Sequence, residues 1–150
     1  MQRIVLALGL ALALSAPVVA SPSADVAAVP QRFITAFNAG NFSAAIAGCA
    51  PEAAIVDDFP PHAWHGAAAC AHWARDYVAN AKQNAITAAH VVLATPLHVE
   101  IDGDTAYVVF PAVYTYKDHG KPTTLNGVFT VSLRKVAEVW RMTGWAWADH

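Results

Sequence analysis

The chain is organised around one short stretch, Ile55–Gly66, which reads IVDDFPPHAWHG. An apolar run there ends in two adjacent carboxylates, Asp57 and Asp58, and a rigid Pro-Pro turn then leads through two histidines and a tryptophan. No other segment packs titratable and aromatic groups so densely in a chain that is only 13% charged. The pattern predicts a strand over residues 54–58, a turn, and a helix that Gly66 opens.

Apolar residues at helical spacing support that helix. They form one stripe, made of Cys70, Trp73, Ala74, Tyr77, Val78 and Ala81. The stripe favours a place in the core, although Trp73 is large enough to contact a ligand as well.

Upstream of the central stretch, two further helices are predicted. The first carries apolar residues at helical spacing from Val29 to Phe37, and Gly40 ends the pattern as a C-terminal cap would. Asn41 can cap a second, short helix, whose apolar positions include Cys49 and which Pro51 stops.

Downstream, the period changes from helical to alternating at about residue 86. Residues 88–101 read as a strand interrupted at Pro96, and Asp102-Gly103 is a hairpin signal. Three long strands follow, over residues 105–117, 123–134 and 139–148. The order of elements predicts an α+β fold in which a curved, mostly antiparallel sheet wraps around three N-terminal helices.

The strand over residues 105–117 is apolar on both faces between Tyr107 and Tyr116. Helices can cover only one of these faces, and the other needs a partner. We therefore predict a homodimer that forms through the outer face of the sheet.

The N-terminus has the pattern of a cleaved secretory signal. Arg3 precedes an apolar run, a break follows at Pro17, and small residues before Ser21 suit a signal peptidase. The run is about a dozen residues long, short of the roughly 20 that span a bilayer. We expect removal of residues 1–20, a flexible tail over 21–25, a periplasmic or secreted location, and no membrane attachment after cleavage.

Cys49 and Cys70 lie in the part expected to be exported. In an oxidising compartment an even number of cysteines indicates a disulfide, whereas the alternative is two buried thiols. Export favours the bridge. Its loop would enclose the whole central stretch and contribute roughly 3 kcal/mol of stability.

Charge and motifs exclude several classes of function. A net charge of −2 and a pI near 6.3 provide no electrostatic attraction for nucleic acid. No Gly-rich phosphate loop and no His-Glu-x-x-His motif is present. We expect no nucleic-acid partner, no cofactor and no metal.

Four segments carry a family pattern: QRFITAFNAGNF at 31–42, AIVDD at 54–58, GDTAYV at 103–108 and WRMTGW at 140–145. In these segments the chain resembles the nuclear transport factor 2-like superfamily, in its SnoaL-like and ketosteroid-isomerase-like branch. The resemblance implies a cone-shaped α+β barrel over residues 26–150, with an apolar pocket and often a dimer. It implies no single reaction, because the superfamily hosts isomerases, cyclases, dehydratases, hydrolases and non-catalytic proteins.

By this resemblance, Asp58 matches the base of a ketosteroid isomerase. The positions of the two oxyanion donors hold Phe33 and, at or near the second, Gly127, although Asn126 is adjacent. Each missing donor would cost about 2.7–4 kcal/mol of transition-state stabilisation. Ordinary steroid isomerisation is therefore not expected.

Asp58 and His62 are the candidate catalytic residues. Asp58 could instead be a strand-end carboxylate that caps a turn, and His62 could be a solvated loop histidine. Strand alternation sends Asp57 and Asp58 to opposite faces, and only the resemblance selects Asp58 for the pocket.

The candidate pocket wall is aromatic. Its predicted members are Phe33, Phe37, Trp64, Trp73, Phe110, Tyr114 and Phe129. The same rings could fill the cone and leave no cavity.

Two hypotheses about function follow. One is a protein that binds an unknown apolar or aromatic small molecule and, if it is an enzyme, is a cofactor-independent isomerase, cyclase, dehydratase or hydrolase. The other is a non-catalytic dimeric interaction module with an occluded pocket.

Overall fold

The computed structural model describes residues 21–149, so the predicted signal segment lies outside the described residues. Three helices are present there: α1 spans Pro22–Asn38, α2 spans Phe42–Ile46 and α3 spans Ala69–Gln83. The Ser21 side chain accepts a hydrogen bond from the Ala24 backbone and so caps α1. Residues 21–25, expected as a flexible tail, thus cap and begin the first helix.

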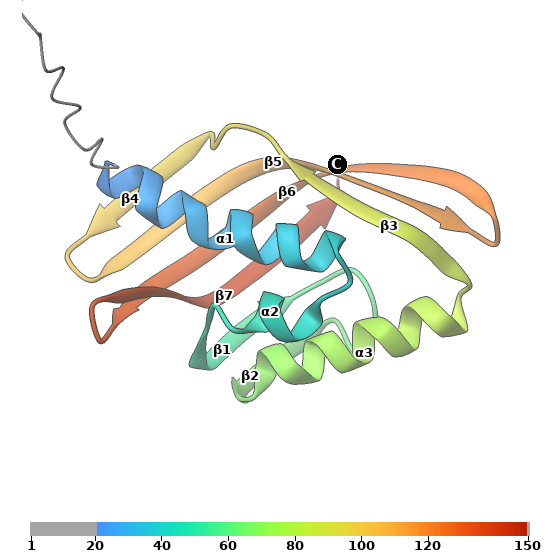
Figure 1. The fold of residues 1–150 in the computed structure, drawn as a ribbon, viewed down its shortest axis with the longest axis horizontal. Coiled ribbons are helices and arrows are strands. Elements are labelled where there is room, and N and C mark those ends of the chain that lie inside the picture. The colour runs from blue at the N-terminus through green and yellow to red at the C-terminus, as the bar shows by residue number, and fades with distance from the viewer. Residues whose placement is uncertain (1–20, 150) are drawn as a thin grey trace, which may run out of the picture.

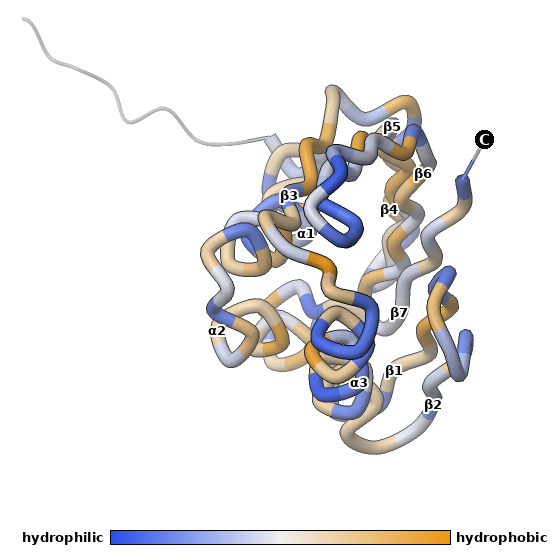
Figure 2. The backbone as a smooth tube through the Cα atoms, turned by 90° about the vertical axis from the view of Figure 1, so that its right-hand side faces the viewer, coloured by the Kyte–Doolittle hydropathy of each residue, from blue (hydrophilic) through white to orange (hydrophobic). Residues whose placement is uncertain are grey.

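Within residues 21–149, seven strands form one sheet. They are β1 (Cys49–Val56), β2 (Ala63–Ala67), β3 (Ile86–Leu93), β4 (His98–Asp102), β5 (Thr105–Asp118), β6 (Lys121–Val136) and β7 (Val139–Asp149). Their order is β2-β1-β7-β6-β5-β3, and β4 also pairs with β5. β1 and β7 pair in parallel, whereas the other pairs are antiparallel. The helices lie on one side of the curved sheet (Figures 1 and 2), which confirms the predicted α+β class.

The segment after the Pro-Pro turn is a strand, and the prediction of a helix opened by Gly66 was wrong. β2 folds back on β1 as a hairpin, with Trp64 opposite Ile55 and Ala67 opposite Glu52. Gly66 lies inside this strand, and α3 begins only at Ala69. Five residues of mixed polarity carry no alternation that would have predicted a strand.

Two other boundaries differ from the prediction. Cys49, expected in the second helix, begins β1, because α2 ends at Ile46. The strand expected over residues 88–101 is two strands, β3 and β4, which pair with the two halves of β5. The break includes Pro96, which has no backbone N–H to donate to the sheet.

The core lies between the helices and the inner face of the sheet. Alternate residues of β6, including Phe129, Val131 and Leu133, are buried there, as the alternation predicts. Val108 and Phe110 of β5 are completely buried beside them. No helix within residues 21–149 is long and apolar enough to span a membrane.

The predicted disulfide is confirmed. Cys49 and Cys70 are bonded, with their Cα atoms 6.7 Å apart. The bond joins the start of β1 to the first turn of α3 and closes a loop that contains the whole central stretch.

Removing this bond should destabilise the protein. We expect the double variant Cys49→Ala/Cys70→Ala to lose roughly 3 kcal/mol of unfolding free energy, because the unfolded chain regains the freedom of the open loop. Urea denaturation measures the loss, and wild-type protein unfolded under reducing conditions should match the variant. Equal stability of the oxidised wild type and the double variant would contradict the prediction.

Gly144 of β7 lies so close to β1 that no side chain fits. It is opposite Ala54 in the parallel β1–β7 pair, and an added Cβ would overlap the Ala54 carbonyl oxygen. Because a backbone carbonyl cannot rotate away as a side chain can, Gly144→Ala must push the two strands apart. We expect this variant to lose about 3 kcal/mol of unfolding free energy.

Gly48→Ala is the matched control for that prediction. An added Cβ at Gly48 would be 3.7 Å from Val29 Cγ1, an ordinary contact. Its cost should stay below about 1 kcal/mol in the same urea denaturation. Similar losses in both variants would show that the close approach of β1 and β7 is not what excludes a side chain.

Candidate functional site

The two carboxylates of the central stretch lie just beyond the end of β1. Because the strand ends at Val56, strand alternation no longer sets the directions of Asp57 and Asp58. The Asp58 backbone N–H donates to Asp57 Oδ1 at 2.9 Å, and both side chains line the same cavity. The prediction that the two residues point to opposite faces is therefore wrong.

Asp57 is held by donors on both of its carboxylate oxygens. Trp73 Nε1 of α3 donates to Oδ2 at 2.7 Å, while the Asp58 backbone N–H occupies Oδ1. Burial nevertheless raises the pKa of Asp57 from 3.8 to about 7, against the opposing effect of the Trp73 hydrogen bond. The negative charge of Asp58 adds to the rise.

Asp58 is the more accessible member of the pair. Its side chain is exposed, yet crowding by neighbouring atoms raises its pKa above the ordinary value. A hydrogen bond with the Asp57 carboxyl opposes this rise, and the charge of Asp149 adds to it. The two environments differ, because Asp57 is the more buried of the two and is held by Trp73.

A cavity of about 60 Å³ adjoins the pair and is lined mainly by aromatic rings. Its wall consists of Phe33, Ile34, Phe37, Asp57, Asp58, Phe59, Trp73, Tyr77, Val91, Tyr114, Phe129, Trp145 and Trp147. At about 10–15 Å³ per water-sized site it holds on the order of four to six waters. Pockets for drug-sized ligands measure roughly 300–1,000 Å³, so this cavity suits a much smaller molecule.

Most of the aromatic residues expected at the pocket lie on this wall, namely Phe33, Phe37, Trp73, Tyr114 and Phe129. Two lie elsewhere. Phe110 is completely buried in the core. Trp64 is separated from the cavity by Phe59, whose ring centroid is 5.0 Å from that of Trp64, and its indole N–H donates to Asp76.

Sequence reasoning placed Tyr114 at the pocket but missed that Tyr77 joins it there. Tyr77 of α3 and Tyr114 of β5 both line the cavity, and their hydroxyl oxygens are 2.9 Å apart. Burial raises the pKa of both phenols, so both remain protonated at neutral pH. Tyr77 follows Trp73 by four residues and therefore shares its helix face, which is the signal that could have found it.

His62 does not pair with Asp58. Its ring Nδ1 lies 3.2 Å from the Asp57 carbonyl oxygen, and the side chain is exposed at the turn. A charge on His62 lowers the pKa of Asp58, but this is the smallest of the effects on that residue. The structure thus places His62 at the turn, beside the main chain.

The two positions that lack oxyanion donors are filled by aromatic packing. The Phe33 ring centroid is 5.6 Å from that of Trp73 and 4.9 Å from that of Trp145. At Gly127 an added Cβ would come within 2.7 Å of the Trp147 ring. The hydroxyls of Tyr77 and Tyr114 are consequently the alternative O–H donors on the described wall.

A SnoaL-like domain profile matches residues 26–146. The chain belongs to the SnoaL-like domain family. The match covers the helices from the second turn of α1 onward and nearly the whole sheet. No curated protein matches closely enough to count as a relative.

Solved structures show the same fold. A nuclear transport factor 2-like superfamily protein from Salmonella enterica has a TM-score of 0.68 at 14% identity over 81% of this chain and 86% of that chain. A ketosteroid isomerase-like protein from Erwinia carotovora has a TM-score of 0.68 at 20% identity, and the match covers 85% of this chain and 95% of that chain. A CaMKII hub from S. rosetta has a TM-score of 0.70 at 20% identity, and the match covers 89% of this chain and 100% of that chain. These similarities confirm the fold that the resemblance implied.

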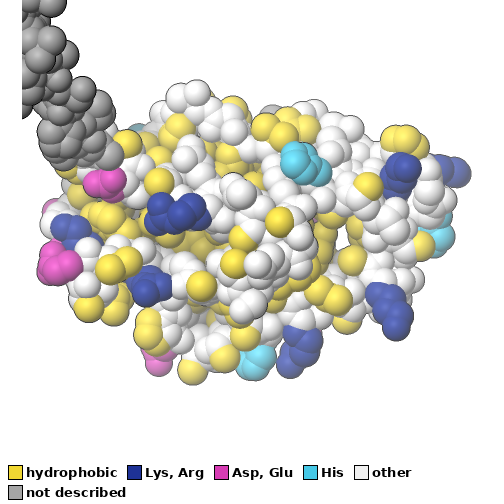
Figure 3. All heavy atoms as spheres, in the orientation of Figure 1, with side chains coloured by type: hydrophobic (Ala, Val, Ile, Leu, Met, Phe, Trp, Pro, Cys, Tyr) yellow, Lys and Arg dark blue, Asp and Glu magenta, His cyan; other side chains and the backbone are white. Residues whose placement is uncertain are grey.

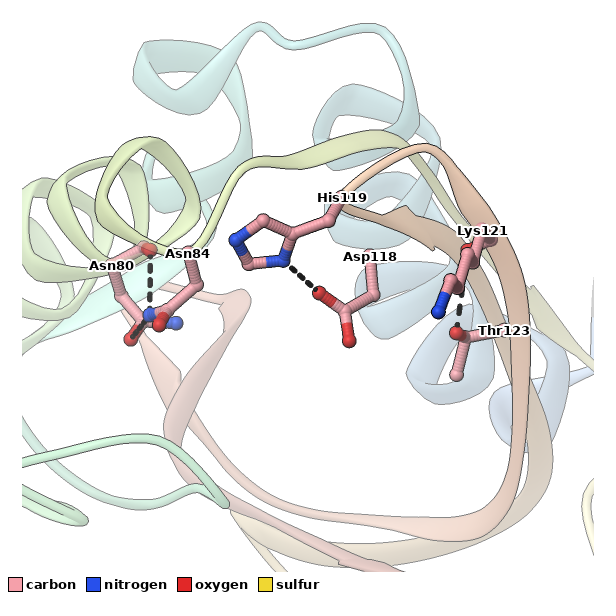
Figure 4. A network of polar contacts seen from close by, with 6 residues as sticks. All are labelled: Asn80, Asn84, Asp118, His119, Lys121 and Thr123. Carbon is pink, nitrogen blue, oxygen red and sulfur yellow. Dashed lines mark hydrogen bonds and ion pairs between the residues drawn. The ribbon is translucent and has the colours of Figure 1, made fainter.

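A second polar group lies on the β5–β6 hairpin of this SnoaL-like domain. His119 Nδ1 is 2.6 Å from Asp118 Oδ1, and the His119 ring points toward the end of α3, where Asn84 donates to Asn80 (Figure 4). These residues lie outside the cavity wall. Within residues 21–149, no three His, Cys, Asp or Glu residues are placed to hold a metal ion.

Proposed function

We propose that this SnoaL-like domain is an exported protein that binds a small, largely apolar molecule beside Asp57 and Asp58 and transfers a proton with these residues. The observation that carries the proposal is the carboxyl pair set into the wall of an aromatic cavity. Burial raises the pKa of both groups. Acid–base catalysts are most effective when their pKa lies near the working pH.

The two carboxyl groups take different roles. Asp58 is the more exposed of the two and its carboxylate is not held by Trp73, so it accepts the proton. Asp57 is fixed by Trp73 and holds Asp58 in place through the backbone N–H of Asp58. Such a site is cofactor-independent and suits an isomerase, cyclase, dehydratase or hydrolase.

The tyrosine pair supplies the complementary donor. In the Tyr77–Tyr114 hydrogen bond one hydroxyl donates to the other, so the second O–H is free. A substrate oxygen that gains negative charge when Asp58 removes a proton would accept from this free O–H.

Intact-mass spectrometry of the native protein recovered from the periplasm or medium tests the proposal. The mass should correspond to a chain that begins at or near Ser21, together with a bound small molecule. Asp58→Asn should weaken binding of that molecule, whereas Asp102→Asn, an equal charge change on exposed Asp102 at the end of β4, should not. A retained N-terminal segment would overturn export, and a ligand-free chain with no response to added ligands would overturn the binding site.

We also propose a homodimer through the outer face of the sheet. On that face Val113 of β5 lies opposite Val92 of β3, which is 54% exposed. Monomeric proteins rarely leave contiguous apolar faces open to water. The non-catalytic interaction module remains the alternative function because it would use this face alone.

Light scattering on a sizing column tests the dimer. The wild-type protein should have twice the mass of one chain, and Val113→Glu should have the mass of one chain, because a buried carboxylate would face its own copy across the two-fold interface. Val139→Glu is the control, since Val139 is exposed at the start of β7. A wild-type monomer would contradict the proposal.

A further inference from the structure

The cavity wall carries negative charge without a compensating cation. Among the described residues that line it, none is Lys, Arg or His, whereas Asp57 and Asp58 both lie on it. Neither carboxylate takes part in an ion pair within residues 21–149. Asp149 adds further negative charge near Asp58, and His62 acts on Asp58 only weakly from the exposed turn. Elsewhere Lys and Arg are spread singly over the face drawn in Figure 3.

Three aromatic rings of the wall pack close together. The centroid distances are 4.9 Å between Phe33 and Trp145, 5.1 Å between Trp73 and Trp145, and 5.6 Å between Phe33 and Trp73. The rings are inclined to one another by 49°, 87° and 46° respectively, and all three residues line the cavity. Ring faces attract ammonium groups that lie within about 6 Å. The hydrogen bond from Trp73 Nε1 to Asp57 also increases the electron density of that indole.

One carboxylate is free to contact a ligand. Both oxygens of Asp57 already accept from Trp73 and from the Asp58 backbone. Asp58 is exposed, and in the described part of the chain its only hydrogen bonds are within this carboxyl pair and with its own backbone. An N–H donor that enters the cavity therefore finds Asp58 as its acceptor.

We propose that the ligand of this cavity is a small organic cation, an alkylammonium whose charge faces Asp58 and whose alkyl part lies against Phe33, Trp73 and Trp145. This inference rests on the proposed function, because it assumes that the cavity is a ligand site. A cation supplies the opposite charge that the carboxyl pair lacks, whereas a neutral molecule leaves that charge unpaired and an anion meets charge of its own sign. The small volume limits the alkyl part to a few carbons.

Three probes with the same branched four-carbon skeleton separate these cases: isobutylammonium, isobutanol and isobutyrate. We expect isobutylammonium to bind about tenfold more tightly than isobutanol at low salt, a difference of about 1.4 kcal/mol. Isobutyrate should bind most weakly. NMR titration of the labelled protein measures all three affinities, and the indole N–H signals of Trp73 and Trp145 report whether the probe is in the cavity. Added salt should reduce the advantage of the cation.

Two variants locate the charge that selects the cation. Asp58→Asn should remove most of the preference for isobutylammonium over isobutanol, and Asp102→Asn should leave it unchanged. Isobutanol or isobutyrate binding as tightly as isobutylammonium would overturn the cation inference while leaving the cavity as a ligand site. A preference that survives in Asp58→Asn would equally overturn the assignment of Asp58. If none of the probes shifts the two indole signals, the proposed binding function fails together with the inference.

Discussion

Given a 3-oxo-Δ5-steroid, the protein should form no appreciable amount of the conjugated isomer. That reaction removes a proton next to a carbonyl and leaves a negative charge on the oxygen, which needs hydrogen-bond donors. A carboxylate is present at Asp58, but the donor positions implied by the family resemblance hold Phe33 and Gly127. Losing two donors slows such a reaction by roughly four to six orders of magnitude.

The shape of the site strengthens this expectation. Phe33 is buried against Trp73 and Trp145, and the ring of Trp147 lies against Gly127, so aromatic carbon occupies both donor positions. The cavity of about 60 Å³ is also far smaller than the roughly 300–1,000 Å³ of pockets that enclose drug-sized ligands such as steroids. Both the chemistry and the space required for a steroid are therefore missing.

An ultraviolet assay for the conjugated product measures the rate, with Asp58→Asn as the comparison. Wild type and variant should both remain at the buffer rate. A fast reaction that disappears in Asp58→Asn would contradict the prediction, and Tyr77→Phe and Tyr114→Phe would then test whether the tyrosine pair has replaced the missing donors.

The elements that the sequence predicts well are those whose pattern is long. In β6, a strand of 16 residues, the alternation correctly places Phe129, Val131 and Leu133 on the buried face. The disulfide was predictable because the sequence holds only two cysteines and the export expected from the N-terminal pattern would favour their oxidation. β2 was missed because five residues are too few to establish a period, and only its pairing with β1 makes it a strand.

The candidate site was less predictable because it depends on contacts between distant residues. Alternation failed at Asp57 and Asp58 since the strand ends one residue before them. The donor to Asp57 comes from Trp73, 16 residues away, and Tyr77 meets Tyr114 across 37 residues. No local pattern encodes such distances, although the alternate residues Trp145 and Trp147 of β7 could have been assigned to one face of the strand.

The stability of the fold should decrease as the pH rises from about 4 to about 7, because of Asp57. Its pKa is raised from 3.8 to about 7 in the folded protein, mainly by burial. Between these two values the unfolded chain releases the proton while the folded chain keeps it, so the folded state binds more protons and is progressively disfavoured by rising pH. At about 1.4 kcal/mol per pKa unit, the decrease amounts to as much as about 4 kcal/mol.

Urea denaturation at a series of pH values from 4 to 8 measures this decrease. Asp57→Asn cannot ionise, so its unfolding free energy should vary much less over the same range, whatever stability it loses because one amide oxygen replaces two acceptors for Trp73 and the Asp58 backbone. Asp102→Asn should retain the wild-type dependence. The comparison uses the slope with pH and not the absolute stability, which separates the titration of Asp57 from the loss of a hydrogen bond. Equal slopes for the wild type and Asp57→Asn would contradict the prediction, because they would show that Asp57 does not keep its proton in the folded protein over this pH range.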